Sequence, residues 1–271
     1  MAIVKDPKVT LHMYTLRKST QELEDFENTL QRVADMGYKS VQISPRPFYT
    51  TEQLAERLNY YGLSADSAYC DVYQIPEKID QIAKDAELLG TDVLRTNSIR
   101  KEDRMTKEGY ESFAAHMEMC GKLLRERGLD FMYHFHAFEW VDFGGIRGMD
   151  ILMNQTDPNH VMFQPDMFWL TGAGTEPSRS LAMFEGRMRY IHCKDYIIRK
   201  PKDEVLEKFT YASAPVGTGN QHWAEITKSA LKLGVENFVV EDDIGLLDPF
   251  ESAQISFTNL TKLIEEAKKE I

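Results

Sequence analysis

The sequence predicts an α/β protein that folds as a single (β/α)8 TIM barrel domain over residues 1–271. Three observations predict this fold. Short apolar runs alternate with amphipathic stretches along the chain, and such alternation favours parallel strands joined by right-handed crossovers. Glycine links a helical stretch to a strand at five places. Four of the runs end in residues able to bind metal, as expected where parallel strands bring their carboxyl ends to one rim.

Each predicted strand is a short run rich in apolar, β-branched or aromatic residues. The eight runs lie at 9–14, 40–43, 63–65, 93–94, 131–133, 161–163, 188–191 and 238–240. Eight parallel strands with intervening helices are enough to close a barrel.

Helical spacing of apolar residues predicts the segments between these strands. The first helix, opened by Ser19 and Thr20, places Leu23, Phe26, Leu30 and Val33 on one face. Others are expected after Pro76 and at about 106–127, 149–152, 176–186, 222–233 and 248–268. The glycines that can end helices in the left-handed conformation are Gly37, Gly62, Gly90, Gly128 and Gly234.

A doubly wound open sheet is the alternative architecture. It would be expected to carry a glycine-rich phosphate loop after a central strand. Gly217 and Gly219 precede a helix, but a third glycine is missing and the preceding segment, 212–216, is a poor central strand. The barrel is therefore the preferred prediction.

The charge balance argues against a nucleic-acid partner. The chain has 32 Lys and Arg against 43 Asp and Glu, a formal net charge of −11, and no basic block suited to a phosphate backbone. A phosphorylated small substrate is neither supported nor excluded by this balance.

The cysteines favour a reducing compartment, and the hydropathy pattern favours a protein without a membrane span. Cys70, Cys120 and Cys193 are odd in number and lack C-x-x-C spacing, which fits free thiols. We expect a cytoplasmic protein without a membrane partner, because neither a signal peptide nor an apolar stretch of the roughly 20 residues needed to span a bilayer is evident.

Candidate metal ligands follow four successive predicted strands. His134, Asp166, His192 and Glu241 come directly or closely after the runs at 131–133, 161–163, 188–191 and 238–240. Two imidazoles and two carboxylates suit manganese, magnesium, cobalt or zinc. Purely structural roles remain open for these residues: a histidine can form a hydrogen bond in the core, Asp166 can cap a helix, and Glu241 can belong to a solvated acidic loop.

Three other residues near these positions are candidates for catalysis or substrate binding. His136 shares a strand face with His134 because side chains alternate along a strand. Lys194, close after His192, can stabilise an oxyanion, or it can be a solvated charge. Trp169 offers a flat apolar face for the C–H side of a sugar ring.

With these residues in view, the chain resembles the sugar phosphate isomerase/epimerase family with the xylose isomerase-like barrel. That group also includes inosose dehydratases, keto-sugar epimerases and, more remotely, endonuclease IV. The likeness spans nearly the whole chain and is carried by the segments 11–17, 134–139 (HFHAFE), 166–169 (DMFW), 192–195 (HCKD), 215–219 (PVGTG) and 240–241.

The resemblance implies that one residue from each of strands five to eight holds the metal. Here these would be His134, Asp166, His192 and Glu241. Two departures stand out: His134 occupies a position where related epimerases often have glutamate, and Gln42 replaces an acidic residue of strand two. His136, Glu139 or Glu241 are then the candidate bases, and Glu139 is an alternative ligand to His134.

From the resemblance we expect a metal-dependent isomerase or epimerase of a keto-sugar or related polyol. The ion, manganese in first place, would stabilise an enediolate after proton removal beside the carbonyl, and Lys194 would stabilise oxyanion charge. The expected substrate-binding residues are Trp169, Phe168, Trp140 and His12.

Three alternatives use the same barrel. A lyase would expel a β-substituent, as a dehydratase or a 3-keto-glycoside-cleaving enzyme does. A non-catalytic sugar-binding barrel would bind without turnover, alone, as a homo-oligomer or with a partner subunit. A phosphodiesterase for damaged DNA is disfavoured by the acidic balance and by the small number of His and Glu ligands.

Overall fold

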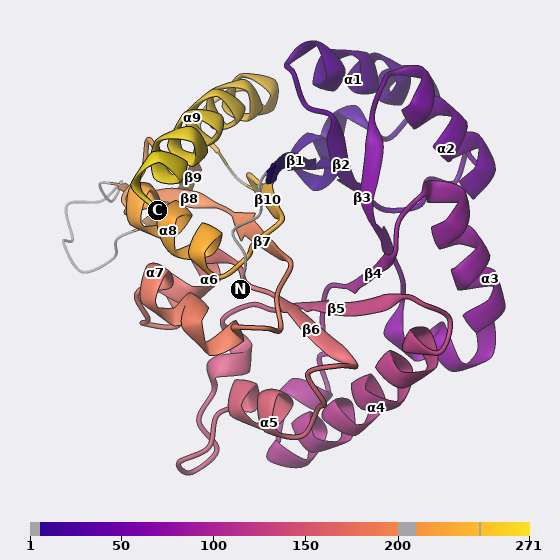
Figure 1. Ribbon diagram of the computed structural model, residues 1–271, viewed down its shortest axis with the longest axis vertical. Coiled ribbons are helices and arrows are strands. Elements are labelled where there is room, and N and C mark those ends of the chain that lie inside the picture. The colour runs from indigo at the N-terminus through magenta and orange to yellow at the C-terminus, as the bar shows by residue number, and fades with distance from the viewer. Residues whose placement is uncertain (1–5, 200–209, 244) are drawn as a thin grey trace.

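All eight predicted strands form in the computed structural model, which describes residues 6–199, 210–243 and 245–271. They are β1 (Lys8–His12), β2 (Ser40–Ile43), β3 (Ser64–Tyr69), β4 (Val93–Thr96), β5 (Asp130–His134), β6 (Val161–Gln164), β7 (Tyr190–Cys193) and β10 (Asn237–Val240). Every neighbouring pair is parallel, in the order β6-β5-β4-β3-β2-β1-β10-β7. The predicted (β/α)8 barrel is therefore confirmed (Figure 1).

Helices surround the barrel on its outside (Figure 1). They are α1 (Leu23–Asp35), α2 (Thr51–Tyr60), α3 (Ile75–Leu89), α4 (Lys107–Arg125), α5 (Gly148–Asn154), α6 (Met167–Gly172), α7 (Pro177–Ser180), α8 (Trp223–Lys232) and α9 (Pro249–Glu270). Short 3-10 turns are η1 (Met13–Ser19), η2 (Val72–Gln74), η3 (Asp103–Met105), η4 (Phe138–Trp140) and η5 (Leu181–Phe184). Across the described ranges, no helix is both long and apolar enough to cross a membrane.

Several predicted boundaries are wrong. The third and seventh strands, predicted at 63–65 and 188–191, form at Ser64–Tyr69 and Tyr190–Cys193. The first strand ends at His12, and Met13 and Tyr14 belong to η1. The helix expected at 176–186 is split, because α7 ends at Ser180 and the chain continues as η5.

Strand alternation divides the apolar core into two parts. Val93, Met132, Tyr190 and Val239 pack together in one cluster, with Met162 against it. Their neighbours along the strands belong to a second, larger cluster shared with the helices. In that cluster Phe113 of α4 packs against Tyr133 with ring centroids 5.3 Å apart. The first cluster fills the barrel interior, and residues two positions further along the same strands lie in the next interior layer.

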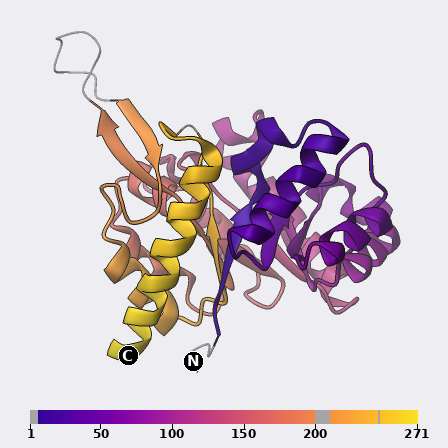
Figure 2. The ribbon, with the colours of Figure 1, turned by 90° about the horizontal axis from the view of Figure 1, so that it is seen from above.

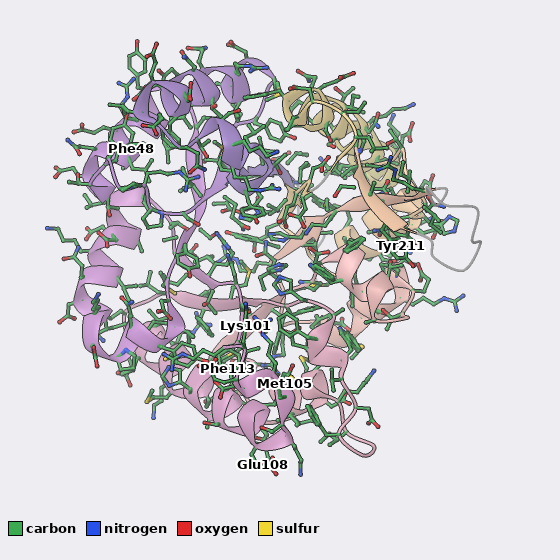
Figure 3. The ribbon with its side chains drawn as sticks, turned by 180° about the vertical axis from the view of Figure 1, so that it is seen from behind. Phe48, Lys101, Met105, Glu108, Phe113 and Tyr211 are labelled. Atoms are coloured by element: carbon green, nitrogen blue, oxygen red, sulfur yellow. The ribbon has the colours of Figure 1, made fainter. Side chains whose placement is uncertain are left out.

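An antiparallel hairpin interrupts the seventh repeat, between β7 and α8. β8 (Asp195–Arg199) pairs with β9 (Thr210–Ala214), and this two-stranded sheet lies outside the barrel order. It projects beyond the barrel, with Tyr211 62% exposed (Figures 2 and 3). The segment 212–216, a poor central strand by sequence, thus begins in the hairpin.

The barrel closes between β6 and β7 through few main-chain contacts. Phe163 N donates to Arg187 O at 2.7 Å, and His192 N donates to Pro165 O at 2.8 Å. The buried Arg187 side chain adds hydrogen bonds to Val161 O at 3.0 Å and Thr156 Oγ1 at 2.6 Å. Closure therefore depends on a buried guanidinium as well as on the strands.

Glycine ends the helices as expected. Gly90 follows α3 with φ of 70°, a left-handed conformation that is costly for residues with a Cβ. The other four predicted cap glycines, Gly37, Gly62, Gly128 and Gly234, also have positive φ.

A different glycine, Gly121, is required by packing. Its Cβ would lie 2.2 Å from the carbonyl oxygen of His160. Alanine gains about 1 kcal/mol of helix propensity, but forcing extra atoms into a packed contact costs about 1–3 kcal/mol. We predict that Gly121→Ala lowers the free energy of unfolding by about 1–2 kcal/mol in urea titrations. Ser112→Ala, on the exposed face of the same helix, should not lower it, and equal behaviour of the two variants would contradict the packing argument.

Candidate active site and metal centre

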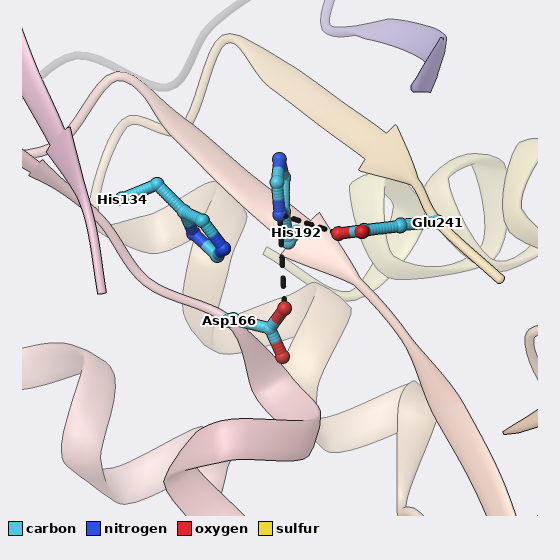
Figure 4. Close-up of side chains that lie close together, drawn as sticks. All are labelled: His134, Asp166, His192 and Glu241. Atoms are coloured by element: carbon cyan, nitrogen blue, oxygen red, sulfur yellow. Dashed lines mark ion pairs between the residues drawn. The ribbon is translucent and has the colours of Figure 1, made fainter. Parts of the chain in front are cut away.

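The four candidate ligands converge at the carboxyl ends of neighbouring strands. His134 ends β5, Asp166 follows β6, His192 lies within β7 and Glu241 follows β10. One ligand atom from each lies within 4.8 Å of the others, and all four residues are buried. Figure 4 shows the side chains pointing toward one another.

The two carboxylate oxygens of Asp166 face different partners. Its Oδ1 accepts a hydrogen bond from Trp169 N at 3.0 Å and so caps α6. Its Oδ2 lies 3.6 Å from His192 Nδ1. The capping interpretation is correct, and it leaves the second oxygen to face the cluster.

Main-chain and amide oxygens orient the two histidines. His134 Nδ1 lies 3.4 Å from Gln164 O, and a carbonyl can only accept, so this nitrogen carries the hydrogen and Nε2 is left with a lone pair. His192 Nε2 lies 2.7 Å from Gln42 Oε1. The lone pair of a neutral His192 is therefore on Nδ1, which lies 2.9 Å from Glu241 Oε2.

Gln42 is itself held in one orientation. Its Nε2 donates to Asp66 Oδ2 at 3.1 Å and lies 3.3 Å from Ser67 Oγ. An amide nitrogen must face the carboxylate, so the amide oxygen faces His192. Burial raises the pKa of Asp66 to about 6.

The atoms at the centre are buried without hydrogen-bond partners among the described residues. They are Asp166 Oδ2, His192 Nδ1 and Glu241 Oε2. Burial lowers the pKa of His192, but the carboxylates of Glu241 and Asp166 outweigh burial and raise it above its ordinary value. The centre thus attracts positive charge, and its nitrogen and oxygen donors fit a divalent ion.

Lys194 lies beside this centre. Its Nζ is 3.4 Å from Glu241 Oε2, 3.6 Å from Asp166 Oδ2 and 2.8 Å from Asp243 Oδ2. Burial alone would lower the pKa of Lys194, but the three carboxylates raise it above its ordinary value. The side chain is 3% exposed, so it is not a solvated surface charge.

Asp243, two residues after Glu241, is the carboxylate nearest to Lys194. Burial, followed by repulsion from Glu241, raises the pKa of Asp243 to about 6. Burial would raise the pKa of Glu241. Nearby positive charge, that of Lys194 above all, instead holds this pKa well below its ordinary value.

Two further histidines adjoin the cluster. His136 has its ring centroid 4.7 Å from that of His134 and 5.3 Å from Trp169. His12 Nδ1 lies 3.4 Å from Glu241 Oε1. Burial lowers the pKa of both His12 and His136 to about 4, so both imidazoles are neutral at pH 7.

The expected aromatic residues separate into two groups. The Trp169 ring centroid is 5.5 Å from Lys194 Nζ, and Phe168 packs against Trp169 and against Tyr196 of the hairpin. Trp140 instead contacts Phe135 and Arg147. Among the described residues, the structure therefore brings Trp169 next to Lys194, with Phe168 packed on Trp169, but shows no such contact for Trp140.

Glu139 is fully buried but is not part of the four-residue cluster. It accepts hydrogen bonds from the Tyr133 hydroxyl and, at 2.8 Å, from His136 N. Burial raises the pKa of Glu139 to about 8, although both hydrogen bonds oppose the shift. Its contacts make it a support for the His136 backbone.

Comparison with known proteins gives two results. The xylose isomerase-like TIM barrel family matches residues 30–245. An inosose dehydratase of Geobacillus thermodenitrificans is 23% identical over 258 residues, covering 84% of this chain and 86% of that enzyme. One of Geobacillus kaustophilus is 24% identical over 191 residues, covering 62% of this chain and only 61% of that enzyme.

Solved structures share the fold at low identity. A sugar phosphate isomerase/epimerase from Parabacteroides distasonis superposes with a TM-score of 0.75 at 20% identity, covering 97% of both chains. A xylose isomerase-like TIM barrel protein from Mycobacterium smegmatis, in complex with magnesium, gives 0.72 at 14% identity and covers 98% of this chain and 99% of its own.

We predict that the purified protein binds about one equivalent of divalent metal and that Glu241→Gln weakens this binding by at least about 100-fold. Loss of partners that only orient ligands already costs about 10–100-fold, and Glu241 would be a direct ligand. Elemental analysis and manganese titration measure the effect. Glu225→Gln, an exposed residue of α8, should bind like the wild type. Equal metal content in both variants would contradict the assignment.

Glu139 gives a prediction about stability and pH. A carboxyl whose pKa is raised from 4.5 to about 8 by folding stabilises the fold most below pH 4.5, and this contribution is lost as the pH rises through about 8. Between pH 5 and 9, the wild type should lose on the order of 3–5 kcal/mol more unfolding free energy than Glu139→Gln. Urea denaturation across this range tests it, with Glu225→Gln as the control. Parallel curves for the wild type and Glu139→Gln would show that this carboxyl is ionised throughout.

Proposed function

Because this chain belongs to the xylose isomerase-like TIM barrel family, we propose that it is a divalent-metal-dependent isomerase or epimerase of a keto-sugar or related polyol. One observation carries the proposal: buried atoms of Asp166, His192 and Glu241 that have no hydrogen-bond partner among the described residues converge, together with His134, beside the buried Lys194. Such a site suits a reaction that develops negative charge on a substrate oxygen.

His134, Asp166, His192 and Glu241 would hold the metal. Manganese is our first choice, with magnesium, cobalt or zinc as alternatives. When bound, the ion would supply Lewis-acid stabilisation of that oxygen. Lys194 adds a fixed positive charge that needs no reorganisation, because three carboxylates already hold its ammonium group.

Proton transfer falls to side chains that border the cluster. His136 is neutral at pH 7 because burial lowers its pKa to about 4, so its imidazole can accept a proton from the carbon next to the carbonyl. Glu241, whose pKa lies well below its ordinary value, is ionised and is the second candidate base. Glu139 positions His136 through the hydrogen bond to its backbone.

Trp169 and Phe168 would form the apolar wall of the sugar site. Both lie at the start of α6, directly after Asp166, so the wall is built next to a proposed metal ligand. An indole face packs against the C–H side of a sugar ring, while the ring hydroxyls can reach the polar cluster.

A lyase is the second candidate. The two curated relatives described above are inosose dehydratases that are 24% and 23% identical to this chain. Removal of the same proton followed by departure of a β-hydroxyl would give dehydration. The two outcomes differ in whether a proton returns to carbon or a substituent leaves.

We predict that the manganese-loaded protein, incubated in heavy water with a panel of keto-sugars and inososes, exchanges a carbon-bound hydrogen of at least one compound. Mass spectrometry separates the outcomes: deuterium gain without mass loss indicates isomerisation or epimerisation, and loss of water indicates dehydration. Lys194→Met should lower the rate by about 100-fold or more while retaining metal, whereas Lys122→Met, on the exposed face of α4, should not. Sugar binding without exchange or product would indicate a non-catalytic barrel.

A further inference from the structure

Arg95 is a buried arginine inside the barrel. It follows Val93 on β4 by two positions, and Val93 belongs to the interior cluster with Met132, Tyr190 and Val239. Alternation along a strand therefore places Arg95 in the same interior, one layer closer to the carboxyl-terminal rim. The residue is 0% exposed.

Two of the three guanidinium nitrogens of Arg95 have no hydrogen-bond partner among the described residues. Nη1 donates to Asn97 Oδ1. Nε and Nη2 are buried without a hydrogen-bond partner in the part of the chain that the structure describes. A buried charge with unpaired donors costs stability, so a fold keeps such a group where something else will pair with it.

Other arginines of this protein show what the free edge binds. Arg57 uses Nε and Nη2 to hold both oxygens of Glu27, with Nε donating at 2.7 Å. Arg147 uses the same two nitrogens for Asp150, at 2.8 and 2.7 Å. In both cases the planar edge matches the two oxygens of a carboxylate. On Arg95 this edge is free.

The charges around Arg95 connect it to the proposed active site. The carboxylates of Asp66 and Glu241 are the first two charges that counter the lowering of its pKa by burial. Asp66 already accepts from Gln42 and Ser67, and Glu241 already contacts His192 and Lys194. Tyr69, 38% exposed, lies with its ring centroid 5.8 Å from Cζ, so the guanidinium is one side chain below the surface.

Resting on the function proposed above, we propose that Arg95 binds a carboxylate of the substrate through Nε and Nη2, which makes the substrate class a keto-sugar acid. A carboxylate suits the site better than a phosphate does. The proposed subsite has a single guanidinium, that of Arg95, and the negative charges of Asp66 and Glu241 act on it, so a monoanion is favoured over a dianion. Lys194 is already committed to three carboxylates.

The test compares ligands that differ in the acid group. Calorimetry on the magnesium-loaded protein measures the affinities of 2-keto-D-gluconate, 5-keto-D-gluconate and D-fructose, the last being the neutral counterpart of the first. We expect at least one acid to bind about tenfold or more tightly than fructose. Arg95→Met should remove this preference and leave fructose affinity unchanged, which separates the guanidinium from chelation of an acid by the metal. Arg127→Met, whose arginine pairs with Asp80 at the surface, should behave as the wild type.

Thermal unfolding provides a second measurement. Arg95→Met should unfold at the same or a higher temperature than the wild type, because an unpaired buried charge is removed; a purely structural arginine would give a lower midpoint. The proposal is overturned if neither acid binds more tightly than fructose, if Arg95→Met keeps the preference, or if fructose 6-phosphate is preferred to both acids. If the preference for the acids depends on Arg95 but no hydrogen exchange occurs in heavy water, the carboxylate subsite is supported and the proposed reaction is rejected.

Discussion

Closure of the barrel between β6 and β7 is the constraint on which the site depends. Only this junction brings Asp166 next to His192, through the hydrogen bond from His192 N to Pro165 O. Once it forms, β5 and β10 flank the junction, and His134 and Glu241 approach from either side. An open sheet with the same strands would leave β6 and β7 at opposite edges, and the four donors would not meet.

The polar groups around the cluster form hydrogen bonds to the outer atoms of the candidate ligands and not to the inner ones. Gln164 O and Gln42 Oε1 each engage the outer nitrogen of a histidine, and Trp169 N engages the outer oxygen of Asp166. Among the described residues, the inner atoms then face one another and the Lys194 ammonium group, which lies 3.4 Å from Glu241 Oε2 and 3.6 Å from Asp166 Oδ2. Lys194 reduces the repulsion between the carboxylates, which is why the pKa of Glu241 can stay low in a buried position.

The sequence predicted the barrel and the four converging residues for one reason: each residue follows an apolar run, and parallel strands end at a common rim. Asp166 shows the limit of that argument, since capping and cluster membership were weighed as alternatives and the structure shows one oxygen capping while the other faces the cluster. Arg95 and Asp66 could not be anticipated in this way, because they lie within strands, where only the pairing register reveals which face is interior. The hairpin was also missed, because β8 and β9 have only five residues each and the segment 212–216 was considered only as a central strand.

The shared use of Asp166 has a wider consequence. Asp166 Oδ1 caps α6, the helix that carries the aromatic residues proposed to contact sugar. A group bound to Oδ2 of the same carboxylate would therefore be connected to α6 through the Asp166 side chain. The backbone amide of Trp169 donates to the carboxylate that the proposed cation would also use, and the Trp169 ring centroid lies 5.5 Å from Lys194 Nζ. Under the proposed function, loading of the centre would therefore change the electrostatic surroundings of this indole, and tryptophan fluorescence would register it before any turnover takes place.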